Sequence, residues 1–202
     1  MTILNSAVAP PSRGVSAPFV TERDFYPRAA ALRLQVEDAI FSTGASNAGI
    51  TPFAYAFIPE IYQFLTVGAG EILESDLLQD FINRLSSWAD DKLNLQHVST
   101  PQLRLYIKGC SRTLVRDDVE AGWHYMLWLT PLLRRKTQVR IAAGSEVQSE
   151  KSPLLTLQRV IRFQLEFNQL LVTNSQCPYS VETGPLSMNP LEGYLFLDGY
   201  IW

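Results

Sequence analysis

From Gln102 onward the sequence is divided into short apolar runs, and this pattern limits the fold more than any other feature. Within residues 103–107, leucine or isoleucine occupies every second position, as in a strand with one buried face. Residues 123–129 form an apolar and aromatic run that contains one histidine, as in a strand buried on both faces. Further short runs cover residues 138–142, 160–165, 168–173 and 194–201. Such a series of short strands is typical of a β-barrel or a β-sandwich.

Two helices are expected before these strands. Residues 25–41 carry apolar side chains at helical spacing, and Pro27 suits the first helical turn. The second helix begins at Ser75, which is a good N-cap, and its apolar residues continue at helical spacing to Trp88. Between the helices, the aromatic stretch 53–64 predicts a short strand and a turn of helix. Helices followed by six or more strands predict an α+β fold, with the helices packed outside a barrel or sandwich.

The length and the charge limit the class of protein. A chain of 202 residues with 47% apolar residues is sized for one globular domain. Seventeen Lys and Arg against twenty Asp and Glu give a net charge of −3, whereas a nucleic-acid-binding protein needs a basic face. Two cysteines and two histidines are too few for a disulfide scaffold or a zinc motif. We therefore expect no nucleic-acid partner.

The N-terminal segment differs in composition from the rest. Residues 1–20 are rich in Pro, Ser, Ala and Val, which predicts a flexible arm followed by a single domain at 21–202. The first nine residues lack the basic start and the long apolar run of a secretory signal. No segment reaches the roughly 18 apolar residues of a membrane span. The expected location is cytoplasmic, with no membrane partner.

Three segments carry a familiar pattern: LRLYIKGCSRTLVRDDVEAGWHYMLWLT (103–130), FNQLLVTNSQCPYSVE (167–182) and EGYLFLDGYIW (192–202). In order and spacing they resemble the core of the bacterial Fe(II)- and 2-oxoglutarate-dependent oxygenases. The resemblance covers about half of the chain, from Leu103 to Trp202. It implies a double-stranded β-helix, a jelly-roll barrel like that of the cupins, with the N-terminal helices packed outside.

The resemblance also identifies positions at which this chain departs from the family. In the family, a segment of the type Y-x-x-G-C-x-x-x-L-H-x-D supplies two iron ligands; here Val115 stands at the histidine position and Asp117 is kept. The distal histidine belongs to a P-H-x-V turn, which here carries Tyr179. The arginine that pairs with 2-oxoglutarate follows E-G at the start of the last strand, where this chain has Tyr194.

These exchanges change the chemistry that the resemblance implies. A non-haem iron centre uses two imidazoles and one carboxylate, and valine has no ligand atom. Tyr179 must lose a proton with a pKa near 10 before its oxygen can bind iron as a phenolate. Asp117 alone, with waters, holds a divalent ion only loosely, and Tyr194 offers no cation to a carboxylate. We therefore predict no metal and no cofactor.

Other residues near these positions have open alternatives. His124, between Trp123 and Tyr125, is either a replacement metal ligand or a hydrogen-bonded core residue. His97 follows the second helix in a polar stretch and is expected on the surface. Arg112 lies three residues before the lost histidine position and either binds an anionic group of a substrate or is a surface arginine.

The candidate site therefore has two sets of residues. Asp117 and Tyr179 are the candidate catalytic residues, as proton donor or acceptor. Aromatic and apolar residues at neighbouring positions are candidates for the substrate-binding wall, although residues of these types are also ordinary core filling. Together with Arg112, the substrate-binding set is Tyr106, Val115, Trp123, Tyr125 and Tyr194.

The leading hypothesis is a metal-free enzyme on an oxygenase scaffold. It catalyses a non-redox tailoring step, a cyclisation, isomerisation or elimination, on a small biosynthetic intermediate, because positioning of a flexible substrate can itself supply rate. Two alternatives stay open: a non-catalytic pseudo-oxygenase that acts as a binding or scaffold partner, and an oxygenase with unusual metal ligands. The expected partner is a small-molecule substrate, with a homo-oligomer or a homologous oxygenase partner left open.

Overall fold

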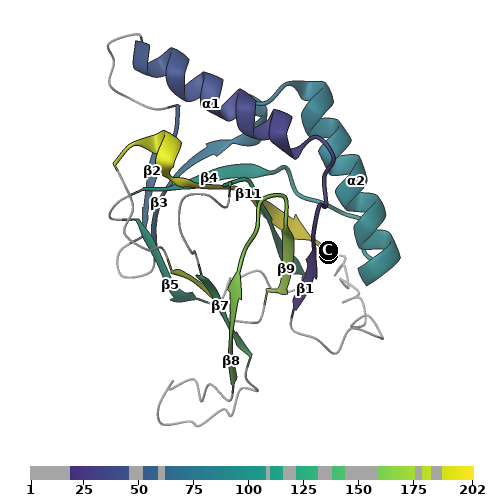
Figure 1. Ribbon diagram of the computed structural model, residues 1–202. Coiled ribbons are helices and arrows are strands. Elements are labelled where there is room, and N and C mark those ends of the chain that lie inside the picture. Colours follow the sequence, from purple (N-terminus) through teal and green to yellow (C-terminus); the bar gives the residue numbers. More distant parts are fainter. Residues whose placement is uncertain are drawn as a thin grey trace, which may run out of the picture.

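A computed structural model describes residues 19–45, 52–58, 62–107, 110–115, 122–131, 138–143, 159–175, 179–182 and 188–202 (Figure 1). The N-terminal part contains two long helices and three strands, and the C-terminal part is built from strands. In chain order the elements are β1 (Phe19–Glu22), α1 (Ala29–Ala45), β2 (Ala54–Ile58), β3 (Tyr62–Gly68), η1 (Ala69–Glu71), α2 (Ser75–Leu93), β4 (Gln102–Tyr106), β5 (Ser111–Val115), β6 (Trp123–Trp128), β7 (Gln138–Ala143), β8 (Arg159–Gln164), β9 (Leu170–Asn174), β10 (Tyr179–Glu182), η3 (Pro190–Glu192) and β11 (Tyr194–Ile201).

The described strands form one curved antiparallel sheet. Its order is β1-β9-β6-β11-β4-β3-β5-β10-β7-β8, and β2 pairs with β3 outside this path. Figure 1 shows β5, β7 and β8 on the side of the molecule away from the helices, so the sheet curls from a layer next to the helices to a second layer opposite. The chain therefore has the α+β, double-stranded β-helix architecture that the sequence predicted.

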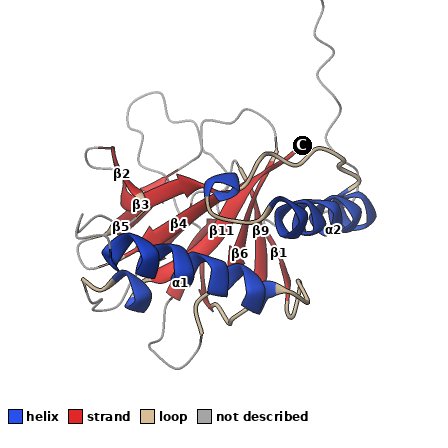
Figure 2. Cartoon of the chain, turned by 90° about the horizontal axis from the view of Figure 1, so that it is seen from above, coloured by secondary structure: helices blue, strands red, loops and turns tan. Residues whose placement is uncertain are grey.

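The helices cover one face of the sheet, as expected (Figure 2). Every fourth residue of α2 from Leu77 to Leu93 is buried, which gives the helix one continuous apolar face. Phe81 on this face lies 6.2 Å from the Tyr125 ring of β6, measured between centroids. The helix ends at Asn94, whose φ of 57° is the left-handed conformation that asparagine tolerates.

The segment between β1 and α1 is packed against α2. The rings of Phe25 and Tyr26 meet Phe81 edge-on at centroid distances of 6.3 and 5.5 Å. The Tyr26 hydroxyl donates hydrogen bonds to Asp80 Oδ2 at 2.8 Å and to the Leu77 carbonyl at 3.1 Å. These contacts hold the start of α1 on the second helix.

Several element boundaries differ from the sequence prediction. Strand β1 begins at Phe19, before the expected boundary at residue 20, and its backbone pairs with β9; residues 1–18 lie outside the described part. The stretch expected as a strand and a helical turn is the β2–β3 hairpin. The segments at 111–115 and 179–182, expected within turns, are strands. In each case pairing with a strand distant in sequence supplies backbone hydrogen bonds that local residue preferences do not reveal.

None of the helices in the described residues is long and apolar enough to cross a membrane.

Candidate functional site

The face of the sheet away from the helices carries a row of stacked aromatic rings. Tyr194, at the start of β11, is paired across the strands with Tyr106. The Tyr106 and Phe196 rings stack at 5.3 Å, Phe196 and Trp128 at 5.8 Å, and Trp128 approaches Tyr194 at 5.5 Å. Phe64 of β3 extends the row by stacking on Tyr106 at 5.9 Å. All five rings are buried, so they form an aromatic floor inside the curved sheet.

The two positions that the sequence resemblance assigns to the family's histidines are neighbours in the sheet. The backbone register of β5 and β10 pairs Val115 with Tyr179, and it pairs Arg112 with Val181. The paired positions are two residues apart along β10 but three residues apart along β5, so the register shifts by one residue between the pairs. This is a β-bulge, a device that re-aims residues and is frequent beside active sites.

The same segment of β5 is also paired with β3. Arg112 lies across from Tyr62, and Ser111 lies across from Gln63. Strand β5 is therefore bounded by β3, which carries Phe64 of the aromatic floor, on one side and by β10 on the other.

Two predicted wall residues lie on the other face. Trp123 and Tyr125 alternate along β6 with His124, Met126 and Trp128, so they face the helices. Tyr125 contacts Phe81 of α2. The expectation that Trp123 and Tyr125 line the pocket is wrong, because the strand is buried on both faces and its apolar run does not reveal which residues point inward.

The remaining predicted residues divide by location. Tyr106 and Tyr194 lie in the aromatic floor, with 0% and 3% of their surfaces exposed. Asp117 lies outside the described residues. His97 is exposed at the end of the chain segment after α2, where its ring lies 6.4 Å from that of Trp202, as expected for a surface residue.

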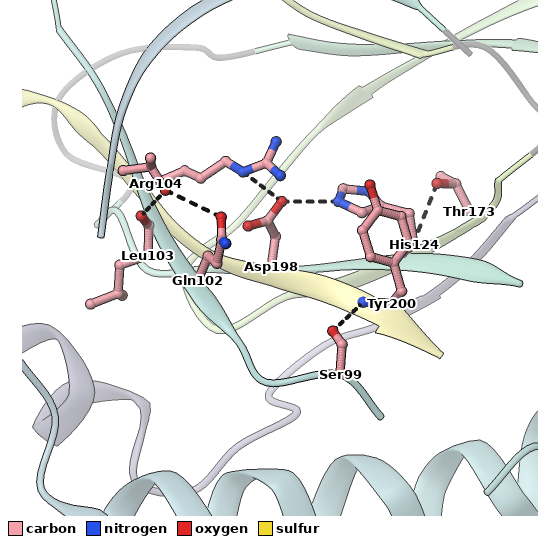
Figure 3. A network of polar contacts seen from close by, with 9 residues as sticks. Ser99, Gln102, Leu103, Arg104, His124, Thr173, Asp198 and Tyr200 are labelled. Carbon is pink, nitrogen blue, oxygen red and sulfur yellow. Dashed lines mark hydrogen bonds and ion pairs between the residues drawn. The ribbon is translucent and has the colours of Figure 1, made fainter. Parts of the chain in front are cut away.

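A buried charged network stands on the same face as the floor (Figure 3). Asp198 of β11 forms an ion pair with Arg104, with Oδ2 2.8 Å from Nε, and the same Oδ2 lies 2.9 Å from His124 Nε2. The side chains of Asp198 and His124 are 1% and 0% exposed, and that of Arg104 is 12% exposed. Three adjacent strands, β4, β11 and β6, are thus joined by one carboxylate.

The sequence interpretation missed Arg104 and Asp198, although a signal was present. Each is a charged residue inside an apolar strand run, and strand alternation places them on the faces of Tyr106 and Tyr194. For His124, the structure shows the hydrogen-bonded core residue, paired with Asp198. Within the described residues, no group of three or more His, Cys, Asp and Glu side chains is arranged to hold a metal ion.

At the positions that the sequence resemblance assigns to the iron ligands, the chemistry of Val115 and Tyr179 does not fit an iron centre. The register puts a valine, which has no donor atom, directly beside Tyr179. At the position that the resemblance assigns to the co-substrate anchor, Tyr194 is buried, and its hydroxyl has no hydrogen-bond partner among the described residues. A neutral phenol cannot replace the bidentate contact of an arginine with a carboxylate.

The structure resembles solved oxygenase structures. It superposes on a Pseudomonas putida prolyl-4-hydroxylase with a TM-score of 0.60 and 15% identity, covering 92% of each chain. The chain has the double-stranded β-helix fold of the Fe(II)/2-oxoglutarate-dependent oxygenases. The resemblance noted in the sequence is confirmed at the level of the fold.

Two further similar structures are biosynthetic enzymes. The 2-oxoglutarate-dependent epimerase SnoN of nogalamycin biosynthesis has a TM-score of 0.62 and 8% identity, with 91% of this chain and 76% of SnoN covered. The carbocyclase SnoK of the same biosynthesis has a TM-score of 0.63 and 10% identity, with 91% and 79% covered. No protein-family model matches this sequence, and no curated protein is significantly similar to it.

Proposed function

We propose that this protein is a metal-free tailoring enzyme that cyclises, isomerises or eliminates a group from a small biosynthetic intermediate. The observation that carries the proposal is the β5–β10 register, which pairs Val115 with Tyr179 and Arg112 with Val181 in neighbouring strands of a barrel with the oxygenase fold. By the sequence resemblance, a family enzyme assembles its reactive centre at these positions, which here carry a phenol, a guanidinium and an aliphatic group. That set suits proton transfer and positioning.

Each residue has a distinct role in the proposal. Tyr179 gives or takes a proton at Oη, and Asp117 is the matching acid–base group. Arg112 binds an anionic group of the substrate. Val115, Tyr106 and Tyr194 shape the apolar wall, and restricting a flexible substrate to a reactive conformer lowers the barrier by itself. The solved structures of an epimerase and a carbocyclase on the same fold support a tailoring role.

The experiment is a comparison of metabolites in a strain with the gene and in a strain without it. A non-redox step predicts an accumulated intermediate that is isomeric with the missing product, or that differs from it by the mass of an eliminated group. The purified protein should convert that intermediate in the presence of a metal chelator and without 2-oxoglutarate. An intermediate that differs by two hydrogens or by one oxygen contradicts the proposal, because such a change is an oxidation.

Two variants connect the conversion to the site. Tyr179→Phe keeps the ring and removes the phenol, so kcat should fall by roughly 10²–10⁴-fold if the hydroxyl moves a proton. Asp117→Asn keeps the side-chain volume and cannot ionise, and it tests the second group in the same way. Full activity in both variants places the chemistry elsewhere, and an unchanged metabolite pattern in the deletion strain favours the binding-partner alternative.

A further inference from the structure

A cavity of about 550 Å³ opens on the helix side of the molecule, between α2 and the segment that joins β1 to α1. Figure 2 shows both helices on the same face of the sheet, and the aromatic floor lies on the opposite face. The cavity is therefore separate from the site of the proposed function. Its volume is within the range of small-molecule binding sites.

The carboxylates that line this cavity have basic side chains beside them. Asp80 Oδ2 lies 3.9 Å from Arg28 Nη1, and Asp91 Oδ2 lies 3.1 Å from Lys92 Nζ. The same lysine also interacts with the charge of Glu22. Among the described residues, these three are the acidic members of the lining, so each negative charge of the lining has a cation near it.

The remaining cation of the lining is Arg84 of α2, which is exposed and takes part in no ion pair among the described residues. Its Nε donates a hydrogen bond to the Phe25 carbonyl, and its guanidinium carbon lies 5.4 Å from the centroid of the Phe25 ring. These two contacts orient the guanidinium. Its terminal nitrogens keep their N–H donors for a ligand in the cavity.

The cavity also offers apolar surface near this guanidinium. Pro27 is exposed, and Trp88 is half-buried one helical turn after Arg84. The Trp88 ring meets the Phe25 ring edge-on at a centroid distance of 6.1 Å, so the indole and the guanidinium contact the same phenyl ring. A planar guanidinium fits a carboxylate through two parallel hydrogen bonds, and a flat apolar body attached to that carboxylate fits beside an indole.

We propose that this cavity binds a small aromatic carboxylate, and that Arg84 is the residue that holds the carboxylate group. The inference goes beyond the proposed function, because the cavity lies on the helix side of the sheet and uses none of the residues assigned to catalysis. A ligand in this place would contact both α2 and the segment that leads into α1, so binding should stabilise the folded chain.

The test measures binding to the purified full chain by thermal unfolding and by calorimetry at constant ionic strength. The probe is benzoate, with benzamide as its uncharged match and inorganic phosphate as an anion without an apolar body. The Tm of the wild type should rise with benzoate concentration, and it should respond less to phosphate and not at all to benzamide. Arg84→Met should weaken the fitted benzoate affinity at least about tenfold, since it removes a charged two-point contact.

A second variant separates binding from folding, because Arg84→Met also removes the hydrogen bond to the Phe25 carbonyl. Asn83→Asp leaves Arg84 in place and adds a negative charge to the lining, and it keeps the oxygen that accepts a hydrogen bond from Gln79 at 2.9 Å. Repulsion should lower the benzoate affinity severalfold. Arg23→Met, which removes an exposed arginine outside the lining, should bind benzoate as the wild type does.

The inference is overturned if benzoate does not stabilise the wild type, or if benzamide or phosphate stabilises it as much as benzoate does. Wild-type benzoate affinity in either Arg84→Met or Asn83→Asp overturns it as well. Tyr179→Phe should bind benzoate normally, since its substitution lies on the barrel side. Loss of conversion in Tyr179→Phe with unchanged benzoate binding therefore supports both proposals separately.

Discussion

Asp198 is the buried carboxylate that links the other two members of the charged network. Its Oδ2 is shared by Arg104 and His124, which come from the strands on either side. Its Oδ1 is buried and has no hydrogen-bond partner among the described residues. A buried carboxylate is stable only when it has such partners. Asp198 can therefore be buried at this position because Arg104 and His124 lie beside it.

Tyr125, on the helix side of the same sheet, gives a prediction about pH. Burial raises its pKa well above the ordinary value near 10, and the Asp198 charge adds to this effect, whereas the nearby Ser99 hydroxyl has a smaller, lowering effect on the pKa. Below pH ~10 the phenol is neutral in both states. Above that pH the unfolded chain releases the proton and the folded chain keeps it, so stability falls as pH rises.

The free energy of unfolding of the wild type should therefore decrease more steeply than that of Tyr125→Phe between pH 9 and 11, by up to about 1.4 kcal/mol per pH unit above pH 10. Urea unfolding at several pH values measures both slopes. Parallel slopes would show that Tyr125 ionises equally in the two states.

At the scale of elements, β11 is an interior strand that joins its two neighbours in the sheet. It pairs with β4 on one side and β6 on the other. One face of β11 supplies Tyr194 and Asp198 to the barrel, and the other packs toward the helices. Gly199 belongs to the second face, directly across from Tyr125.

Gly199 permits a close approach that a larger residue prevents. A Cβ at this position would lie 2.5 Å from Ser99 Oγ and 2.7 Å from the Tyr125 hydroxyl oxygen. Gly199→Ala should therefore lower the free energy of unfolding by roughly 1–3 kcal/mol, as overpacking does in other cores. Gly70→Ala is the matched control, because its Cβ would meet only Leu78 at an ordinary 3.7 Å. Equal urea midpoints for the two variants contradict this account.

At the scale of the whole molecule, the fold brings distant segments of the chain together. Strands β5 and β10 are adjacent in the curved sheet, and their register pairs position 115 with position 179. We expect the fold to tolerate different side chains at these positions, because the backbone hydrogen bonds between the strands do not depend on the side chains.

Iron titration tests whether the side chains at positions 115 and 179 decide metal binding on this fold. The wild type should show no stoichiometric Fe(II) binding by calorimetry, because Val115 offers no ligand atom and Tyr179 only a protonated phenol. Val115→His with Tyr179→His should gain measurable Fe(II) affinity. Neither protein should decarboxylate 2-oxoglutarate, because Tyr194 provides no cation for it. Stoichiometric iron and co-substrate turnover in the wild type would instead support the alternative of unusual ligands.

Strong local patterns were sufficient to predict several elements. The strand at Tyr194–Ile201 and the helix through Trp88 were expected nearly where they lie, since each carries a clear periodicity. The strands at 111–115 and 179–182 were missed. These two strands are stabilised by pairing with each other and with β3 and β7. The sequence of a short charged segment does not show that a distant strand will pair with it.

The sequence by itself determined the α+β order of elements, the resemblance to oxygenases and the residues at the positions that this resemblance assigns to the ligands. These depend on local periodicity and on motifs that can be read along the chain. Only the tertiary structure decided which residues share a face: Trp123 and Tyr125 face the helices, whereas Arg104, Asp198 and His124 meet inside the barrel. The physical reason is that a strand buried on both faces carries apolar residues on both, so its composition does not show which face points into the barrel. Pairing with neighbouring strands, and a one-residue bulge where one occurs, set that orientation instead.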